Sequence, residues 1–308
     1  MGAAPTGFSA RIKANGAGDF LDYCHTLGLG GAELRGEPPL DAEAIRKFRA
    51  RLESYQMHVI FNVRLPNTDA DLPAYEASVK ATRECGAYAL HAAMTQRRYE
   101  EFSSVADYEK SFARNQRQVA LAEPVLRRNK VRLAIENHKG WRAVEQAAWM
   151  KRVSSEWIGV HFDFGNNVSF CEDPMFTLET LKPWILACHI KDMAVERYED
   201  GFLLSEVPLG DGFLDLKTMV DTLRTQAIFD LEMITRDPLK IPVLTDRYWA
   251  TFRDVPASQL AAILSLVDKN PPKKPLPRIA GLNFARQLKL EDANNQASID
   301  YARQHLGL

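Results

Sequence analysis

Four residues of types that bind metal ions recur along this chain at the ends of short apolar segments. Glu136, Asp163 and His189 close the segments LAIE, HFD and ACH, at successive intervals of 27 and 26 residues. Glu232 closes a fourth segment, FDLE. Three carboxylates and one imidazole suit Mn²⁺, Mg²⁺, Co²⁺ or Zn²⁺, and buried carboxylates in one place would repel one another without a cation. We therefore predict that these four residues hold one divalent metal ion, with Mn²⁺ as the first expectation.

The segments that carry these residues belong to a regular alternation. Short apolar runs alternate with longer amphipathic ones, a pattern typical of parallel strands joined by crossover helices. Strands are expected at residues 8–13, 31–35, 57–64, 87–92, 130–137, 158–164, 183–192 and 228–234. The pattern predicts the α/β class and a single (β/α)8 TIM barrel with a C-terminal extension, because residues 14–18 lack the G-x-G-x-x-G turn of the rival doubly wound sheet. In a barrel the strand ends share one face, so the four predicted ligands would meet there.

The barrel is expected to occupy residues 1–268. Its helices include one that begins at the N-cap residue Asp41 and others at 105–129, 143–153 and 258–267. The extension, residues 269–308, consists of a Pro-rich connector, NPPKKPLP, and a tail helix. Apolar positions of the tail include Phe284, Leu288 and Ile299. We expect the tail to pack back on the barrel or to join a second subunit, which would make a homo-oligomer.

The composition limits the classes of function. Of 308 residues, 46% are hydrophobic and 26% are charged, as is ordinary for a globular protein. The formal net charge is -1, so no overall positive field attracts nucleic acid or an anionic membrane. The four cysteines include no C-x-x-C pair, and no apolar run approaches the roughly 18 residues of a membrane span. We expect a reduced, cytoplasmic protein without nucleic-acid or membrane partners.

Six segments resemble the xylose isomerase-like barrel superfamily of sugar isomerases and epimerases. They are GGAELR (30–35), LAIENH (133–138), HFDFGN (161–166), HIKD (189–192), LGDGFLD (209–215) and LEMITRDP (231–238). The resemblance implies that Glu136, Asp163, His189 and Glu232 ligate one ion and that the two glutamates are catalytic. The activity it implies is that of a divalent-metal-dependent sugar isomerase or epimerase, which abstracts a proton alpha to a carbonyl through a metal-stabilised enediolate. Ketose epimerases usually carry a histidine at the position of Asn166 in this chain. This difference argues against simple ketose epimerisation.

A second feature favours a lyase. His138 lies two residues after Glu136, an E-x-H arrangement similar to metal-dependent enzymes that cleave 3-keto glycosides by elimination, including C-glycoside deglycosidase catalytic subunits. That likeness implies cleavage of O- or C-glycosides with His138 as base, and a complex with a small accessory subunit. An endonuclease-IV-type hydrolase shares the fold, but it needs a multi-metal cluster, and seven histidines and a near-neutral charge disfavour it. A sugar-binding barrel without catalysis is the remaining alternative, against which the intact ligand set argues.

Further polar residues on or near the expected strands are candidates for gripping substrate hydroxyls or a phosphate. Lys191 lies two residues after His189 and should point inward with it. The candidate substrate-binding residues are Lys191, Arg197, His161, Asn62, Glu33 and His91, together with Arg64. The expected substrate is a small molecule: a sugar, a keto-sugar or a glycoside.

Overall fold

Eight parallel strands form a closed barrel in the computed structural model of the chain, which describes residues 1–95 and 97–308. Around the barrel the order is β1, β2, β3, β4, β5, β6, β7 and β10, and β10 pairs with β1 to close it. The strands are β1 (Gly2–Ala3), β2 (Gly31–Arg35), β3 (His58–Asn62), β4 (Ala89–Ala92), β5 (Leu133–Glu136), β6 (Ile158–Asp163), β7 (Ile185–Ile190) and β10 (Ile228–Leu231). The predicted α/β class and TIM barrel are confirmed. Every residue of β5 is buried, because one face of the strand meets the barrel interior and the other meets the helices.

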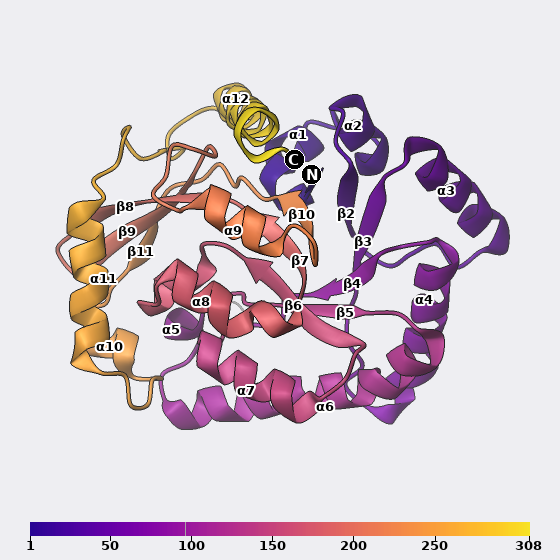
Figure 1. Ribbon diagram of the computed structural model, residues 1–308, viewed down its shortest axis with the longest axis horizontal. Helices are drawn as coiled ribbons and strands as arrows, with labels where there is room; N and C mark the ends of the chain where they lie inside the picture. The colour runs from indigo at the N-terminus through magenta and orange to yellow at the C-terminus, as the bar shows by residue number, and fades with distance from the viewer. Residues whose placement is uncertain (96) are drawn as a thin grey trace.

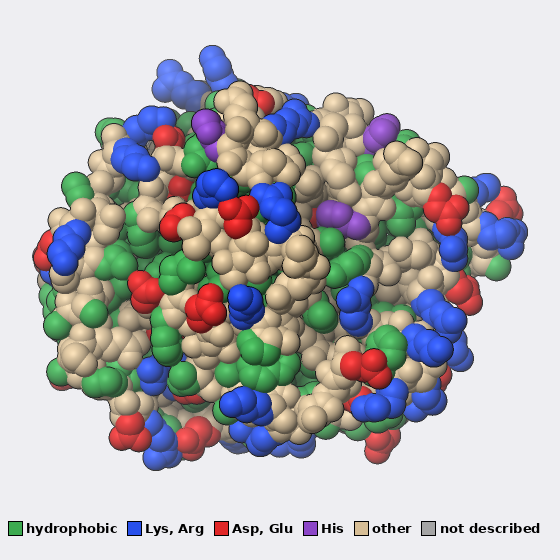
Figure 2. All heavy atoms as spheres, viewed as in Figure 1, with side chains coloured by type: hydrophobic (Ala, Val, Ile, Leu, Met, Phe, Trp, Pro, Cys, Tyr) green, Lys and Arg blue, Asp and Glu red, His purple; other side chains and the backbone are tan. Residues whose placement is uncertain are grey.

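Helices surround the strands (Figure 1). Basic and acidic side chains are interspersed over the face of the molecule that Figure 2 shows. The helices that follow successive strands are α2 (Phe20–Thr26), α3 (Ala42–Tyr55), α4 (Leu72–Glu84), α6 (Val105–Asn129), α7 (Ala143–Val153), α8 (Pro174–Leu181) and α9 (Leu216–Leu223). α6 and α7 have the predicted bounds. α3 begins after its predicted cap, since the carboxylate of Asp41 accepts hydrogen bonds from the backbone N–H groups of Glu43 and Ala44. Within the described residues, none of the helices combines the length and the apolar character that crossing a membrane requires.

The first strand differs from the prediction. Residues 8–13 were expected as a strand, but they end a 3₁₀ turn (Pro5–Phe8) and form the helix α1 (Ser9–Lys13). The strand is instead the two-residue β1, which pairs with β2 on one side and β10 on the other. A strand of two residues is too short to show a hydrophobic period. Residues 8–13 do alternate between apolar and polar types, and this alternation led to the wrong prediction.

The chain leaves the barrel after β7 and builds a second sheet of three antiparallel strands. β8 (Asp192–Tyr198) and β9 (Gly201–Val207) form a hairpin, and β11 (Leu239–Ile241) pairs with β9. On the sequence alone, the interval of 43 residues between His189 and Glu232 predicts a long loop at residues 196–209. The hairpin shows that this prediction is wrong. The helix predicted at 258–267 is present as α11 (Ala257–Lys269), and it packs on β8 and β9 (Figure 1).

The C-terminal helix α12 (Phe284–Tyr301) takes the remaining place on the outside of the barrel. It contacts α1, and the π-helical turn that continues it (Ala302–Leu306) contacts α9 (Figure 1). The carboxylate of Glu291 accepts hydrogen bonds of 2.8 Å from the backbone N–H groups of Ala10 and Arg11. The tail thus packs back on its own barrel, between the helices that follow the first and the seventh barrel strands.

This packing corrects one expectation about a subunit interface. Ile299, expected among the residues that would face a partner, is 2% exposed and belongs to the core of its own chain. Leu306 in the following turn is buried in the same core. Phe284 is 38% exposed at the start of the helix, so a homo-oligomer through this end stays a prediction.

Candidate metal centre

The four predicted ligands lie at one end of the barrel. Glu136 and Asp163 are the last residues of β5 and β6. His189 is the last residue but one of β7, and Glu232 directly follows β10. One ligand atom from each of the four lies within 4.8 Å of the others, and all four side chains are buried. This cluster could therefore hold a divalent metal ion.

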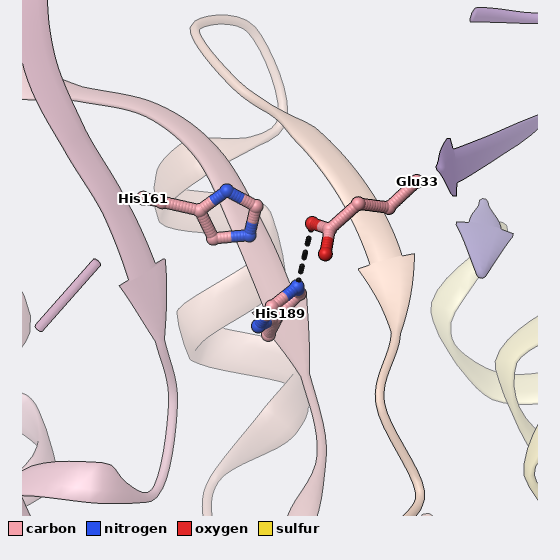
Figure 3. Close-up of side chains that lie close together, drawn as sticks. All are labelled: Glu33, His161 and His189. Carbon is pink, nitrogen blue, oxygen red and sulfur yellow. Dashed lines mark hydrogen bonds and ion pairs between the residues drawn. The ribbon is translucent and has the colours of Figure 1, made fainter. Parts of the chain in front are cut away.

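The imidazole of His189 is oriented so that one nitrogen faces the carboxylates. Its Nε2 donates a hydrogen bond of 3.0 Å to Oε2 of Glu33, a residue of β2 (Figure 3). In the neutral ring the other nitrogen, Nδ1, then carries the lone pair. Nδ1 lies 3.9 Å from Oε1 of Glu136 and 3.6 Å from Oε2 of Glu232, and it has no hydrogen-bond partner within the described part of the chain. A buried nitrogen that has a lone pair, no hydrogen-bond partner and carboxylates beside it is suited to bind a metal ion at the centre of the cluster.

Cationic groups hold the carboxylates together. Nζ of Lys191 lies 2.6 Å from Oδ2 of Asp163 and 2.6 Å from Oε2 of Glu232. Nε2 of His91 lies 3.2 Å from Oε2 of Glu136; burial lowers the pKa of His91, but Glu33 and Glu136 raise it to about 9. A divalent cation at this place would interact favourably with the same carboxylates. Burial alone would lower the pKa of His189, but the carboxylates of Glu232 and Glu33 raise it well above its usual value. A potential that holds a proton on this imidazole would also hold a metal cation.

Polar contacts fix each carboxylate in place. Oδ1 of Asp163 accepts a hydrogen bond of 3.0 Å from the backbone N–H of Asn166. The side-chain amide of Asn166 donates to Oε1 of Glu136 at 3.0 Å, so the residue that departs from the ketose epimerases positions a candidate ligand. The hydroxyl of Thr6 donates to Oε1 of Glu232 at 2.6 Å. The ligand cluster is therefore oriented by the protein itself.

A second trio of possible ligands shares His189 with the first cluster. Glu33, His161 and His189 have ligand atoms within 4.8 Å of one another and are all buried (Figure 3). The ring of His161 lies 4.1 Å from that of His189 between centroids, and neither of its nitrogens has a hydrogen-bond partner among the described residues. Nε2 of His189 is already bonded to Glu33, however, whereas Nδ1 is free for the four-residue cluster. The four-residue cluster is therefore the better candidate for a metal centre.

A cavity of about 780 Å³ lies above this cluster, at the carboxyl ends of the strands. Barrel enzymes place their active sites at this end. Three of the four candidate ligands line the cavity: Glu136, His189 and Glu232. Other polar residues on its wall include Asn62, Arg64, His138, Lys139, Lys191 and Arg236. The cavity therefore gives a substrate direct access to the cluster.

His138, the predicted base, lines the cavity in a defined tautomer. Its Nδ1 lies 2.6 Å from the carbonyl oxygen of Thr95. A carbonyl only accepts hydrogen bonds, so Nδ1 carries the proton and Nε2 of the neutral ring carries the lone pair. Burial lowers the pKa of His138, although the carboxylate of Glu136 opposes this shift. The ring is therefore neutral at pH 7 and able to accept a proton.

The predicted substrate-binding residues separate into two groups. Those that line the cavity are Lys191, Asn62, Glu33 and His91, together with Arg64. Arg197 does not: it lies on β8 and pairs with Asp268 of α11 at 2.8 Å, where both side chains are exposed. The barrel strand ends at Ile190 and the hairpin carries the next residues outward, so Arg197 is placed contrary to expectation. His161 is buried beneath the wall of the cavity and does not line it.

Charged residues of this region that were not predicted from the sequence include Arg236, Lys139 and Glu206. Arg236 lines the cavity and its Nε donates to Oε2 of Glu206 at 3.0 Å. Ile234 also lines the cavity, so alternate residues after Glu232 face it, and this period of two could have indicated Arg236. Lys139 follows β5 in a loop, and Glu206 belongs to the hairpin that was expected as a loop. For these two residues the sequence carried no directional signal.

The sequence match to a known family decides the classification. Residues 21–249, which include all four candidate ligands, match the profile described as the xylose isomerase-like TIM barrel. The chain belongs to the xylose isomerase-like TIM barrel family. The expected resemblance is confirmed, and so is the expectation that this barrel is an enzyme. No curated protein matches the chain by sequence.

Solved structures share the fold of this xylose isomerase-like barrel at low sequence identity. An L-ribulose 3-epimerase is 15% identical over 99% of this chain and 98% of its own, with a TM-score of 0.57. The 3-keto-D-glucoside 4-epimerase of E. coli is 14% identical over 81% of this chain and 92% of its own, with a TM-score of 0.52. A probable 3-DHS dehydratase of Bacillus anthracis is 14% identical over 88% of this chain and 100% of its own, with a TM-score of 0.58.

Proposed function

We propose that this xylose isomerase-like barrel is a divalent-metal-dependent sugar isomerase or epimerase. The observation that carries the proposal is the convergence of Glu136, Asp163, His189 and Glu232 beneath an open cavity, with Nδ1 of His189 facing the carboxylates. An ion held there, Mn²⁺ first and Mg²⁺, Co²⁺ or Zn²⁺ as alternatives, would act as a Lewis acid on a substrate carbonyl. Two of the similar structures are named as sugar epimerases, which supports this class of reaction.

The two glutamates are suited to moving the proton. Glu136 and Glu232 come from β5 and β10, which β6 and β7 separate in the barrel, so they would approach a substrate carbon from different sides. Burial raises the pKa of Glu232, but Lys191 and His189 outweigh this and hold it below its usual value. Glu232 is therefore ionised and can accept a proton alpha to the carbonyl. Return of the proton to the other face gives an epimer, and its return to the neighbouring carbon gives an isomer.

Solvent-hydrogen exchange tests this proposal. Protein loaded with Mn²⁺ is incubated in D₂O with a panel of ketoses, and deuterium in the recovered sugars is measured by NMR. Glu232→Gln should slow incorporation by about 10²–10⁴-fold, the usual contribution of a positioned acid or base. Glu37→Gln is the matched control, because Glu37 lines the same cavity but is exposed and is not one of the clustered ligands. Full exchange by the Glu232→Gln protein, or no metal in the wild type, would contradict the proposal.

The tautomer of His138 favours a second candidate, a lyase that cleaves 3-keto glycosides. Nε2 of His138 would take the proton next to the keto group, the C–H electron pair would form a double bond, and the glycosidic bond would break with its electrons leaving on the aglycone. One similar structure is named as a probable dehydratase, and dehydration is also an elimination. A small accessory subunit belongs to this candidate alone.

Replacing His138 distinguishes the two candidates. A lyase should release nitrophenol from p-nitrophenyl 3-keto-glucoside, and His138→Gln should slow this release by about 10²–10⁴-fold while metal content stays constant. An isomerase should release no nitrophenol, and its deuterium exchange into ketoses should survive the His138→Gln substitution, since the glutamates remain.

A further inference from the structure

Lys139 is a buried cation whose ammonium forms no ion pair with another described residue. Its residue is 3% exposed, and it lines the cavity above the metal centre. Its ammonium donates a hydrogen bond to the side-chain oxygen of Asn166, which is a neutral acceptor. Within the described residues, no carboxylate oxygen lies within 4.0 Å of its Nζ. One neutral hydrogen bond is poor compensation for removing a whole charge from water.

The other cations of the same cavity wall differ from Lys139 in this respect. Lys191 has two carboxylate partners at 2.6 Å, from Asp163 and Glu232. The guanidinium of Arg236 is paired with Glu206 through two hydrogen bonds. Arg64 also lines the cavity, but its side chain is exposed to water. Among the described cations of the wall, Lys139 is therefore the buried one without an ion pair.

The surroundings of Lys139 strengthen the positive potential at its nitrogen. Burial, followed by the nearby charges of Lys191 and Arg236, lowers the pKa of Lys139 to about 8, although Asp163 and Glu206 oppose this. A group whose neighbours disfavour its own positive charge gains most from a negative ligand. Because this point lies on the wall of the substrate cavity, a bound substrate is the natural source of that charge.

We propose that Lys139 anchors an anion-binding subsite, and that the substrate of this barrel carries a carboxylate or a phosphate group. The inference rests on the proposed function for the position of the reacting carbon at the metal centre. It adds that a second, non-reacting part of the substrate is negatively charged and binds Lys139. Asn166 contacts both Lys139 and Glu136, so the subsite and the metal centre share a residue that sets their relative position.

Binding of three matched sugars tests the subsite. D-Fructose, D-fructose 6-phosphate and D-fructuronate share a keto-hexose frame and differ at carbon 6, and their affinities for the Mn²⁺-loaded protein are measured by calorimetry. One anionic sugar should bind about tenfold or more tightly than fructose, as one charge-assisted hydrogen bond allows. The anion that gains this advantage identifies the group as phosphate or carboxylate.

Three variants assign the effect to Lys139. Lys139→Met should lower the ratio of anionic-sugar affinity to fructose affinity to about one, whereas Lys139→Arg should retain the wild-type ratio. Lys151→Met, which removes an exposed cation on α7, is the control for overall charge. The same advantage in the Lys139→Met protein would overturn the proposal, and so would equal affinity for all three sugars.

A second measurement covers the case in which none of the three sugars binds. Inorganic phosphate or acetate should then raise the melting temperature of the wild type, but not of the Lys139→Met protein, relative to chloride at equal ionic strength. No anion effect that depends on Lys139 would reject the subsite. If deuterium exchanges into neutral ketoses but not into anionic ones, the subsite is rejected and the proposed function stands. If the protein holds no metal and exchanges deuterium into none of the sugars, the proposed function is rejected.

Discussion

Glu33 is outside the four-residue cluster, yet it determines which nitrogen of His189 the cluster receives. Its Oε2 accepts the hydrogen bond from Nε2 of His189, and its Oε1 accepts one of 2.8 Å from the side chain of Asn62. The carboxylate is thereby held from both sides. Such partners fix the orientation of a metal-binding imidazole and its basicity.

Glu33→Gln should therefore weaken metal binding without unfolding the barrel. We expect Mn²⁺ affinity to fall by about 10–100-fold, as is usual when a partner of a metal-binding histidine is replaced. Competition with a chelating dye measures the affinity, and circular dichroism checks the fold. Glu37→Gln should leave the affinity unchanged, and an unchanged affinity in Glu33→Gln would show that His189 does not depend on this carboxylate.

The same residues predict how metal affinity depends on pH. In the metal-free protein the carboxylates of Glu232 and Glu33 outweigh burial and raise the pKa of His189 well above its usual value. Below that raised pKa a metal must displace a proton from Nδ1. Mn²⁺ affinity should then rise as the pH rises through neutrality, by about tenfold per pH unit for one released proton. Titrations from pH 6 to 8 check this, and a flat profile would mean that the imidazole is not a ligand.

Side chains in regular strands were the predictable part of the site. The four candidate ligands were expected together because strand ends meet at one face of a barrel, and the structure brings them within reach of one cation. Lys139 was not predicted, because the direction of a loop residue depends on contacts that no period encodes. Glu206 was not predicted, because its strand β9 was expected as a loop. Arg197 was expected in the cavity, but its strand belongs to a different sheet.

At the scale of elements, the short helix α5 (Arg98–Glu101) supports the loop that carries His138 and Lys139. The backbone N–H of Arg98 donates to the carbonyl oxygen of Lys139 at 2.8 Å. The guanidinium of Arg98 is buried, pairs with Glu145 at 2.7 Å and lies 3.5 Å from the ring centroid of Tyr108. This one side chain thus connects α5 with α6 and α7.

Arg98→Met should destabilise the protein measurably. The substitution removes the buried partner of this part-buried ion pair and its hydrogen bond to the carbonyl oxygen of Thr251. We therefore expect the free energy of unfolding to fall by about 1–3 kcal/mol. The neighbouring residue is a matched control: Arg97 pairs with Glu100 at the surface, and Arg97→Met should change stability by less than about 0.5 kcal/mol. Urea denaturation of both variants gives the comparison, and equal effects would mean that the buried pair adds nothing.

Elements were predictable where the chain repeats one pattern for several turns. α6 and α7 have the predicted bounds because each carries a helical period between clear stop signals. The hairpin of β8 and β9 was missed, although Asp200 of its turn is followed directly by Gly201, the first residue of β9, and the dipeptide Asp-Gly indicates a turn. β1 was beyond prediction, because two residues show no period.

At the scale of the whole molecule, α12 belongs to the barrel wall. Asn295 donates a hydrogen bond of 2.7 Å to the carbonyl oxygen of Gly7, and Arg224 of the loop after α9 donates one of 2.6 Å to that of Leu306. With Glu291 these contacts connect the tail to both neighbours along its length. Because α11 packs on the hairpin of β8 and β9, it does not fill the place on the barrel wall between α9 and α1. The tail fills that place.

Ile299→Ala should reveal this contribution to stability. Its side chain lies in the core, so we expect a loss of about 2–4 kcal/mol in the free energy of unfolding. Phe284→Ala, at the exposed start of the same helix, should cost less than about 1 kcal/mol. Light scattering of the Phe284→Ala protein also tests the predicted oligomer: an unchanged mass above that of one subunit would place the interface elsewhere.

The two ends of the polypeptide meet on one loop of the barrel. The carbonyl oxygen of Met1 accepts a hydrogen bond of 2.8 Å from the N–H of Gly30, and the guanidinium of Arg303 donates one of 2.6 Å to the carbonyl oxygen of Leu27 (Figure 1). Since the strands already form a ring in space, a short flexible linker between the termini would make the covalent chain a ring as well. Circular permutants opened at the connector 270–277 would then retain every strand pairing and begin with the tail helix as their first element.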